Sequence, residues 1–323
     1  MHACARLIFL RNRLEAILAV EVPEHQCQIP AATHRLGMVG GMGPVAGAEL
    51  AVDVSGRLAE ARGAKSSIRS GWQVCMLSDP AIETWKNEKM EAWKSVRSSV
   101  DMLWYLARDE FKFTCIGSNT AHLMLQPSPP ANMLSIFEAV SQVIKSEYPG
   151  KKVALMCTDL SMKYVDMGYG EIFKKHGLTF IPPTPPIQKL CMDGIKHVKN
   201  PTEGAASFRK AIDCFMQCVL WYLDEGGASV FALACTEIPV VLKESVMRND
   251  PRVAGREIHI VDSVAALGRT VVQELMREEE AAAASLSNPN NSNPPRVPST
   301  TKKSDRKMPA DSAGVLHVRP STW

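Results

Sequence analysis

The sequence predicts an α/β protein with two similar lobes, each a mostly parallel sheet flanked by helices. Short apolar runs alternate with longer stretches in which apolar residues recur every three or four positions, the pattern of strands alternating with amphipathic helices. Twice, at 117–122 and 234–239, an apolar run ends in a turn of small polar side chains. Parallel sheets place ligand sites at the carboxyl ends of their strands, so we expect both turns to face one cleft between the lobes.

The elements of the first lobe follow from these periodicities. In chain order we expect a strand at 36–39 that ends in glycines, a strand ending at 75–78, a helix with its apolar face between 90 and 106, a strand at 113–116 and a helix around 139–144. The strands are joined through helices, so the connections are right-handed βαβ units.

The second lobe repeats the alternation. We expect strands at 153–157, 178–181, 230–234 and 258–261, and a helix at 208–222. Gly226-Gly227 is a helix stop signal, and Asp262-Ser263 can cap a last helix that runs through Leu275.

These elements give four segments. Residues 1–34 lack periodicity and form an N-terminal extension, either disordered or an extra helix. The first lobe covers 36–148 plus 262–280 and the second covers 149–261, with the boundary near Tyr148-Pro149-Gly150. Residues 281–323 are Ala-rich, then rich in Ser, Asn and Pro with several basic residues, so they are predicted to be a disordered basic tail.

Bulk properties exclude several classes. A net charge of +3 gives no electrostatic case for a nucleic-acid partner, and no run approaches the ~20 apolar residues of a membrane span. Nine cysteines without paired spacing indicate reduced thiols and a cytoplasmic protein, although the N-terminal arginines leave organelle targeting open. Cys214 and Cys218 stand four apart on a helix without a second ligand pair, so no metal site is expected.

Three short motifs carry side chains or backbone groups suited to chemistry. In Gly40-Gly41-Met42-Gly43-Pro44, glycines after a strand let backbone amides approach an anion, with a plain strand–helix turn as the alternative. Ser118-Asn119-Thr120 offers neutral donors for a carboxylate, with simple helix capping as the alternative. In Cys235-Thr236-Glu237 a helix after the strand can stabilise a thiolate; the alternative is a buried structural cysteine.

Taken together, the motifs resemble those of the aspartate/glutamate racemases, a cofactor-independent family of two-lobed α/β enzymes. Three sequence segments match: Gly-Gly-Met-Gly-Pro at 40–44, Ser-Asn-Thr-Ala-His at 118–122 and Cys-Thr-Glu-Ile-Pro at 235–239. In the second segment the family usually has Cys in place of the first residue, Ser. The resemblance covers roughly 36–280 and implies no cofactor, no metal and a homodimer.

The resemblance also implies a role for each site residue. Two thiols of the family flank the substrate Cα, one as base and one as acid. Cys235 matches the group assigned to the L-face, and Ser118 stands at the place of the other cysteine. Asn119, Thr120, Thr158 and Thr236 would hold the α-carboxylate, with Met42, Gly43 and Glu237 beside them. Lys199, or Lys196, would contact a distal carboxylate.

Two departures from the family pattern bear on the reaction. Ser118 is a far weaker acid than a thiol, which predicts a slow or directionally biased enzyme, or a one-base reaction. Trp85 falls near the position at which the family has an arginine that binds the distal carboxylate of the substrate. Its absence argues against aspartate and glutamate as substrates, although Lys86 could substitute for the arginine.

The leading hypothesis is therefore an isomerase, an amino-acid racemase or epimerase acting on a small amino acid or carboxylate through Cys235 and Ser118. A lyase or isomerase that uses Cys235 as its single base is the alternative, and a non-catalytic carboxylate-binding protein is a third. His122 could be an acid/base group, but a helix-borne histidine that is hydrogen-bonded in the interface is the favoured interpretation.

Overall fold

The computed structural model describes residues 34–40, 44–63, 72–78, 96–101, 111–126, 129–199 and 204–286. The chain divides into two compact units, Met1–Leu275 and Met276–Trp323. Both sheets belong to the first unit. Of the second, the described part is the end of one helix.

The elements alternate as the sequence predicts. The strands are β1 (His34–Gly40), β2 (Trp72–Ser78), β3 (Phe111–Ile116), β4 (Lys152–Cys157), β5 (Thr179–Ile181), β6 (Val230–Ala234) and β7 (His259–Asp262). The helices are α2 (Pro44–Arg62), α4 (Asn119–Leu125), α5 (Ile136–Glu147), α6 (Asp159–Lys163), α7 (Tyr169–His176), α8 (Pro185–Lys199), α9 (Ala205–Trp221), α10 (Ile238–Val241), α11 (Glu244–Arg248) and α12 (Ser263–Leu286), with single turns at Val165–Met167, Tyr222–Gly226 and Pro251–Val253.

The strands form two separate parallel sheets, which confirms the predicted fold class. The first has the order β2-β1-β3, and its strands end side by side: Gly40 pairs with Ser78, and Val39 with Ile116. The second has the order β5-β4-β6-β7, with Cys157 paired with Ala234. At the carboxyl edge of each sheet, the turns that follow neighbouring strands therefore emerge side by side.

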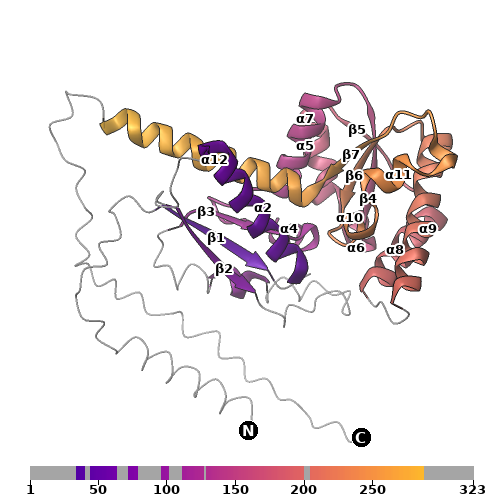
Figure 1. Cartoon of the computed structure of the whole chain (residues 1–323), viewed down its shortest axis with the longest axis horizontal. Coiled ribbons are helices and arrows are strands. Elements are labelled where there is room, and N and C mark those ends of the chain that lie inside the picture. The colour runs from indigo at the N-terminus through magenta and orange to yellow at the C-terminus, as the bar shows by residue number, and fades with distance from the viewer. Residues whose placement is uncertain are drawn as a thin grey trace, which may run out of the picture. The chain divides into compact units, whose positions relative to one another are not determined.

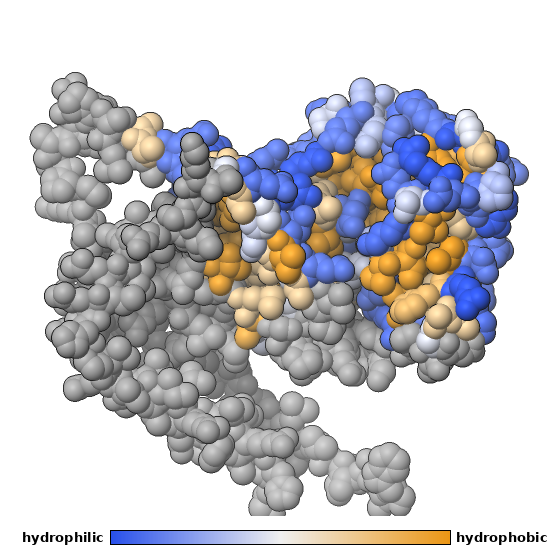
Figure 2. Space-filling model, in the orientation of Figure 1, coloured by the Kyte–Doolittle hydropathy of each residue, from blue (hydrophilic) through white to orange (hydrophobic). Residues whose placement is uncertain are grey.

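Helices cover both faces of the second sheet. In Figure 1, α5 and α7 lie on one side of it and α8 and α9 on the other. The core beneath α8 and α9 includes the fully buried Phe215, Tyr222 and Phe231. In the space-filling view (Figure 2), hydrophilic residues lie along the outer edge of this region, and hydrophobic residues are visible between them.

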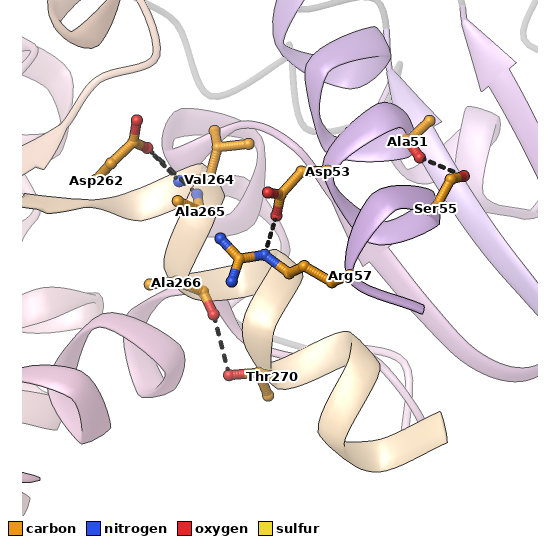
Figure 3. Close-up of polar contacts among 9 residues, drawn as sticks. All are labelled: Ala51, Asp53, Ser55, Arg57, Asp262, Val264, Ala265, Ala266 and Thr270. Atoms are coloured by element: carbon orange, nitrogen blue, oxygen red, sulfur yellow. Dashed lines mark hydrogen bonds and ion pairs between the residues drawn. The ribbon is translucent and has the colours of Figure 1, made fainter. Parts of the chain in front are cut away.

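Local signals in the sequence explain where several helices begin and end. Gly227 has φ 62°, the left-handed conformation that glycine adopts readily, and it ends the turn that follows α9. Asp262 caps α12: its Oδ1 accepts the backbone N–H groups of Val264 and Ala265, as Figure 3 shows. The same view shows the Arg57–Asp53 ion pair on α2, at 2.8 Å. Both the predicted stop and the predicted cap are thus present.

Several helices differ from expectation, among them α12 and α8. α12 continues to Leu286, beyond both the predicted end at Leu275 and the predicted start of the tail at 281. The Glu- and Ala-rich sequence there has high intrinsic helix propensity, which extends a helix without a core beneath it. α8 was not predicted, because its Pro185-Pro186 start and internal Gly194 resemble loop sequence.

Part of the first lobe can be checked only in fragments. A helical segment at 96–101 buries Val96 and Val100, two residues of the predicted apolar face. The rest of that face, the N-terminal extension and most of the tail lie outside the described residues. Within the described ranges, no helix is both long and apolar enough to cross a membrane.

Candidate active site

The two predicted turns begin where buried parallel strands end. Ser118 follows β3 after one glycine, and Cys235 follows β6 directly. A Cβ at Gly117 would lie 3.2 Å from the backbone oxygen of Ala46 on α2, so glycine allows this turn to approach α2 closely. Both turns therefore leave their sheets at the carboxyl edges, as expected.

Ser118 is the N-cap of α4. Its backbone is extended, with φ −149°, and its Oγ accepts the N–H of Ala121 at 3.4 Å. The side chain is buried, only 7% exposed. Capping, the alternative interpretation of this motif, is therefore correct. It does not exclude chemistry, because a hydroxyl that accepts a hydrogen bond can still donate its own proton.

Cys235 belongs to a chain of polar contacts. Its thiol donates to Glu237 Oε2 at 3.0 Å, and the hydroxyl of Thr236 donates to the same oxygen at 3.2 Å. The other oxygen, Oε1, lies 3.2 Å from Lys199 Nζ, on the last turn of α8. Glu237 and Lys199 are mostly buried, 13% and 23% exposed. The carboxylate thus links the thiol to an ammonium group.

The direction of the Cys235 pKa corrects the sequence-based expectation. Burial raises the pKa of this thiol well above its usual value, and the negative charge of Glu237 raises it further. Lys199 and the backbone N–H of Glu237 act in the opposite sense without reversing it. The expected helix dipole contributes little, because α10 has only 4 residues. The isolated site therefore holds a protonated thiol.

Thr158 brings the two turns together. It follows β4 directly, as Cys235 follows β6, and the paired positions Cys157 and Ala234 set these two residues side by side. Its Oγ1 lies 3.5 Å from Oγ1 of Thr120 on α4. Thr158 thus lies beside one residue of each motif, Thr120 and Cys235.

Asn119 has partners that sequence reasoning missed. Its Oδ1 accepts the hydroxyl of Tyr169 at 2.6 Å, and its Nδ2 donates to Ser263 Oγ at 2.9 Å. All three side chains are buried. Ser263 was predicted only as part of a helix cap, and nothing in the sequence around Tyr169 distinguishes it from a core tyrosine.

Solved structures with a similar architecture include amino-acid racemases. The aspartate racemase from Picrophilus torridus matches with a TM-score of 0.55 at 22% identity, over 75% of this chain and 94% of that one. A putative Asp/Glu racemase from Yersinia pestis gives a TM-score of 0.57 at 16% identity, over 75% and 99%. Glutamate racemase from Francisella tularensis, in complex with D-glutamate, gives 0.53 at 13%, over 77% and 83%.

The chain has the aspartate/glutamate racemase fold. No protein-family model matches it. At these identities the likeness establishes the fold, and the activity has to be argued from the side chains.

Within the racemase fold, His122 has a structural role. It is fully buried; Nδ1 lies 3.3 Å from the Ser118 carbonyl, and Nε2 contacts the Leu134 carbonyl at 3.0 Å and the Ile136 N–H at 3.3 Å. Burial lowers its pKa, so the ring is neutral. The expected hydrogen-bonded histidine is therefore present, but its partners lie next to α4 and at the start of α5 and not in an interface.

The lysine alternatives are now distinguishable. Lys199 contacts Glu237, whereas Lys196 pairs with Asp193 at 3.1 Å and is 60% exposed. Met42, Gly43, Trp85 and Lys86 lie outside the described residues, so their predicted places stay predictions. Among the residues that the structure does describe, no group of three or more potential metal ligands is present.

A cavity of about 280 Å³ lies beside α12. Its walls include Arg57, Lys243, Asp262 and Arg269, and none of the predicted site residues line it. The candidate site is therefore defined by its strand-end side chains and not by this cavity.

Proposed function

We propose that this protein is a cofactor-independent amino-acid racemase or epimerase, in which Cys235 and Ser118 move the α-proton on opposite faces of the substrate. The observation that carries the proposal is the contact chain from the Cys235 thiol through Glu237 to Lys199. A structural cysteine needs no carboxylate partner, whereas a proton-transferring thiol needs a group that can accept its proton. The racemase fold supports the same conclusion.

Glu237 supplies the proton acceptor. Its Oε2 takes the thiol proton across the 3.0 Å contact, leaving a thiolate, and Lys199 stabilises the negative charge that remains on the cluster. The substrate's α-ammonium group adds positive charge and thereby lowers the raised pKa of the thiol. The thiolate then takes the α-proton: the Cα–H bond breaks, an S–H bond forms, and the electron pair stays on a carbanion-like substrate.

The donors around Thr158 hold the substrate carboxylate. The hydroxyls of Thr120 and Thr158 lie close together, and Asn119 and Thr236 stand beside them in the two turns. Neutral donors aimed at a carboxylate stabilise the charge that spreads onto it as the α-proton leaves. Ser118 delivers a proton to the opposite face and is reprotonated from water, while Glu237 returns its proton to water, which restores both groups for the next turnover.

The inequality of the two groups makes the saturated turnover rates of the two enantiomers differ, while kcat/KM stays equal in both directions because enantiomers have equal free energies. A serine hydroxyl is rarely ionised at neutral pH, so it donates a proton far more readily than it removes one. Cys235 is assigned to the L-face by the resemblance described above. We therefore propose faster turnover from the L-amino acid than from its D-enantiomer.

A lyase or isomerase with Cys235 as its single base is the second candidate. The observation that favours it is that Cys235 has a carboxylate and an ammonium group in its contact chain, while Ser118 is used as a helix cap. In that reaction the carbanion expels a leaving group and needs no proton on the opposite face.

The substrate is a small amino acid or carboxylate, and a neutral side chain fits best. Lys199 is already engaged by Glu237, which leaves it a poor partner for a second carboxylate. Trp85 in place of the family's arginine supports the same choice. We further propose that the protein is a cytoplasmic homodimer, as the resemblance implies.

Solvent exchange tests the proposal and separates the two candidates. Each common amino acid, as the L- and the D-enantiomer, is incubated with enzyme in D₂O, and the products are analysed for Cα deuterium, configuration and unsaturation. Exchange with inversion, faster from the L-form, supports racemisation; an unsaturated product supports the lyase. Ser118→Ala should retain exchange and lose inversion, and Ser118→Cys should equalise the two directions. Inversion at the wild-type rate in Ser118→Ala would contradict a role for this residue.

A further inference from the structure

Tyr169 connects the second sheet's helices to the candidate site. It is the first residue of α7, it is 2% exposed, and its hydroxyl donates to Asn119 Oδ1 at 2.6 Å. Asn119 Nδ2 donates in turn to Oγ of Ser263, the first residue of α12, at 2.9 Å. Three buried side chains from three helices thus form one hydrogen-bonded row.

The ring of Tyr169 is fixed by its neighbours. It packs edge-to-face on Phe137, with centroids 4.7 Å apart, and on Phe173 at 5.5 Å. The preceding residue is Gly168, where a Cβ would lie 3.2 Å from the Phe137 ring and 3.3 Å from Leu123. Glycine therefore allows α7 to begin against α5 and α4, which sets the hydroxyl in place.

The row determines which way the Asn119 amide faces. Burial raises the pKa of Tyr169 well above its ordinary value, so the phenol stays protonated and must donate. If the amide were flipped, its NH₂ group would face the phenol O–H, and that buried donor would lose its acceptor. In the observed orientation one N–H of Nδ2 is directed to Ser263, and the residues that the structure describes provide no acceptor for the second N–H.

We propose that Tyr169 is a positioning residue, which orients the Asn119 amide so that its second N–H is offered to the carboxylate of the molecule bound between Ser118 and Cys235. This inference rests on the proposed function, because it takes that site to bind an amino acid or a small carboxylate. Tyr169 itself does not touch the substrate. Its role is to keep Asn119 a donor, where a rotated amide would present an oxygen and repel a carboxylate.

Malonate binding tests the positioning role without requiring turnover. The probe is titrated into ¹⁵N-asparagine-labelled protein, and the Asn119 side-chain resonance is identified by its loss in Asn119→Ser. In the wild type, malonate should shift one of the two Nδ2 protons. In Tyr169→Phe, which keeps the ring and removes the hydroxyl, malonate affinity should fall about fivefold to tenfold, the size of one lost oriented hydrogen bond.

Tyr222→Phe is the matched control. Tyr222 is also 2% exposed, and its hydroxyl makes a single hydrogen bond to the Leu155 carbonyl at 3.2 Å, within the core of the second sheet. This variant loses the same kind of buried hydrogen bond and should bind malonate as the wild type does. Equal malonate affinity in Tyr169→Phe and the wild type would overturn the positioning role, as would an equal loss in the two tyrosine variants.

Two further results separate this inference from the proposed function. In the first, the wild type exchanges the α-proton of no amino acid, but its Asn119 amide responds to malonate and this response weakens in Tyr169→Phe. The positioning role of Tyr169 then stands, and the racemase proposal fails. In the second, malonate leaves the Asn119 side-chain resonance of the wild type unchanged. Carboxylate binding by Asn119 is then overturned, whatever the exchange assay shows. Where exchange occurs, Tyr169→Phe should raise KM by a similar factor and change kcat less, since it weakens binding more than proton transfer.

Discussion

At the residue scale, the proposed chemistry depends on the surroundings of Cys235. Its position could be predicted from sequence, because an apolar strand followed by Cys-Thr-Glu is a local pattern. The direction of its pKa could not be predicted. That direction depends on burial and on the Glu237 carboxylate at 3.0 Å, which are properties of the folded chain. Tyr169 and Ser263 were missed for the same reason, since their contacts join segments far apart in the sequence.

The same surroundings predict how the thiol responds to charge. Glu237→Gln removes a negative charge that raises the Cys235 pKa, so that pKa should fall. Lys199→Met removes a positive charge that lowers it, so the pKa should rise further. The measurement is the rate of Cys235 alkylation by iodoacetamide against pH, followed by mass spectrometry. The pH at which the alkylation rate of Cys235 rises should be lower in Glu237→Gln and higher in Lys199→Met than in the wild type.

Cys115 is an internal control for this titration. It is fully buried, and burial alone accounts for its raised pKa, with no contribution from Glu237, Lys199 or Cys235. Its alkylation profile should stay the same in both variants. If the alkylation profile of Cys235 against pH were the same in the wild type and in both variants, Glu237 and Lys199 would not be electrostatically coupled to the thiol.

At the element scale, most strands could be predicted and several helices could not. The run at 230–234 coincides with β6, because a short buried strand flanked by glycines and polar residues has clear ends. α2 was not predicted: it exposes Val52, 73% accessible, so its apolar residues do not follow one face. Helices that pack on several neighbours lose the simple periodicity on which such predictions depend.

The packing of α8 against α9 gives a prediction about stability. A Cβ at Gly194 of α8 would lie 2.5 Å from Cε1 of Phe215 on α9, and Phe215 is fully buried. Gly194→Ala should therefore lower the free energy of unfolding by about 1–3 kcal/mol through overpacking. Urea denaturation measures the change.

Gly56→Ala on α2 is the matched control, because a Cβ there meets nothing within 4 Å. This substitution should raise the free energy of unfolding by about 0.5–1 kcal/mol, since alanine loses less backbone entropy than glycine in a helix. If both variants shifted stability in the same direction, the α8–α9 contact would not be as close as the structure has it.

At the scale of the whole molecule, the fold could be predicted more fully than the activity. The alternation of strands and helices was enough to predict two parallel sheets. Because parallel sheets place ligand sites at the carboxyl ends of their strands, both motifs were expected at strand ends. Solved racemases at 22% identity or less share that architecture. The reaction depends on single side chains, and here the serine at 118 and the tryptophan at 85 depart from the pattern that suggested the family.

The central claim is that Cys235 transfers the α-proton. The most direct measurement is deuterium incorporation at Cα in D₂O, made with the wild type, Cys235→Ala and Cys235→Ser on the amino acid that the wild type exchanges fastest. Unchanged unfolding midpoints in the two variants establish that they are folded. We predict incorporation by the wild type, none above background with Cys235→Ala, and at most a small residual rate with Cys235→Ser. Incorporation at the wild-type rate in folded Cys235→Ala would contradict the account.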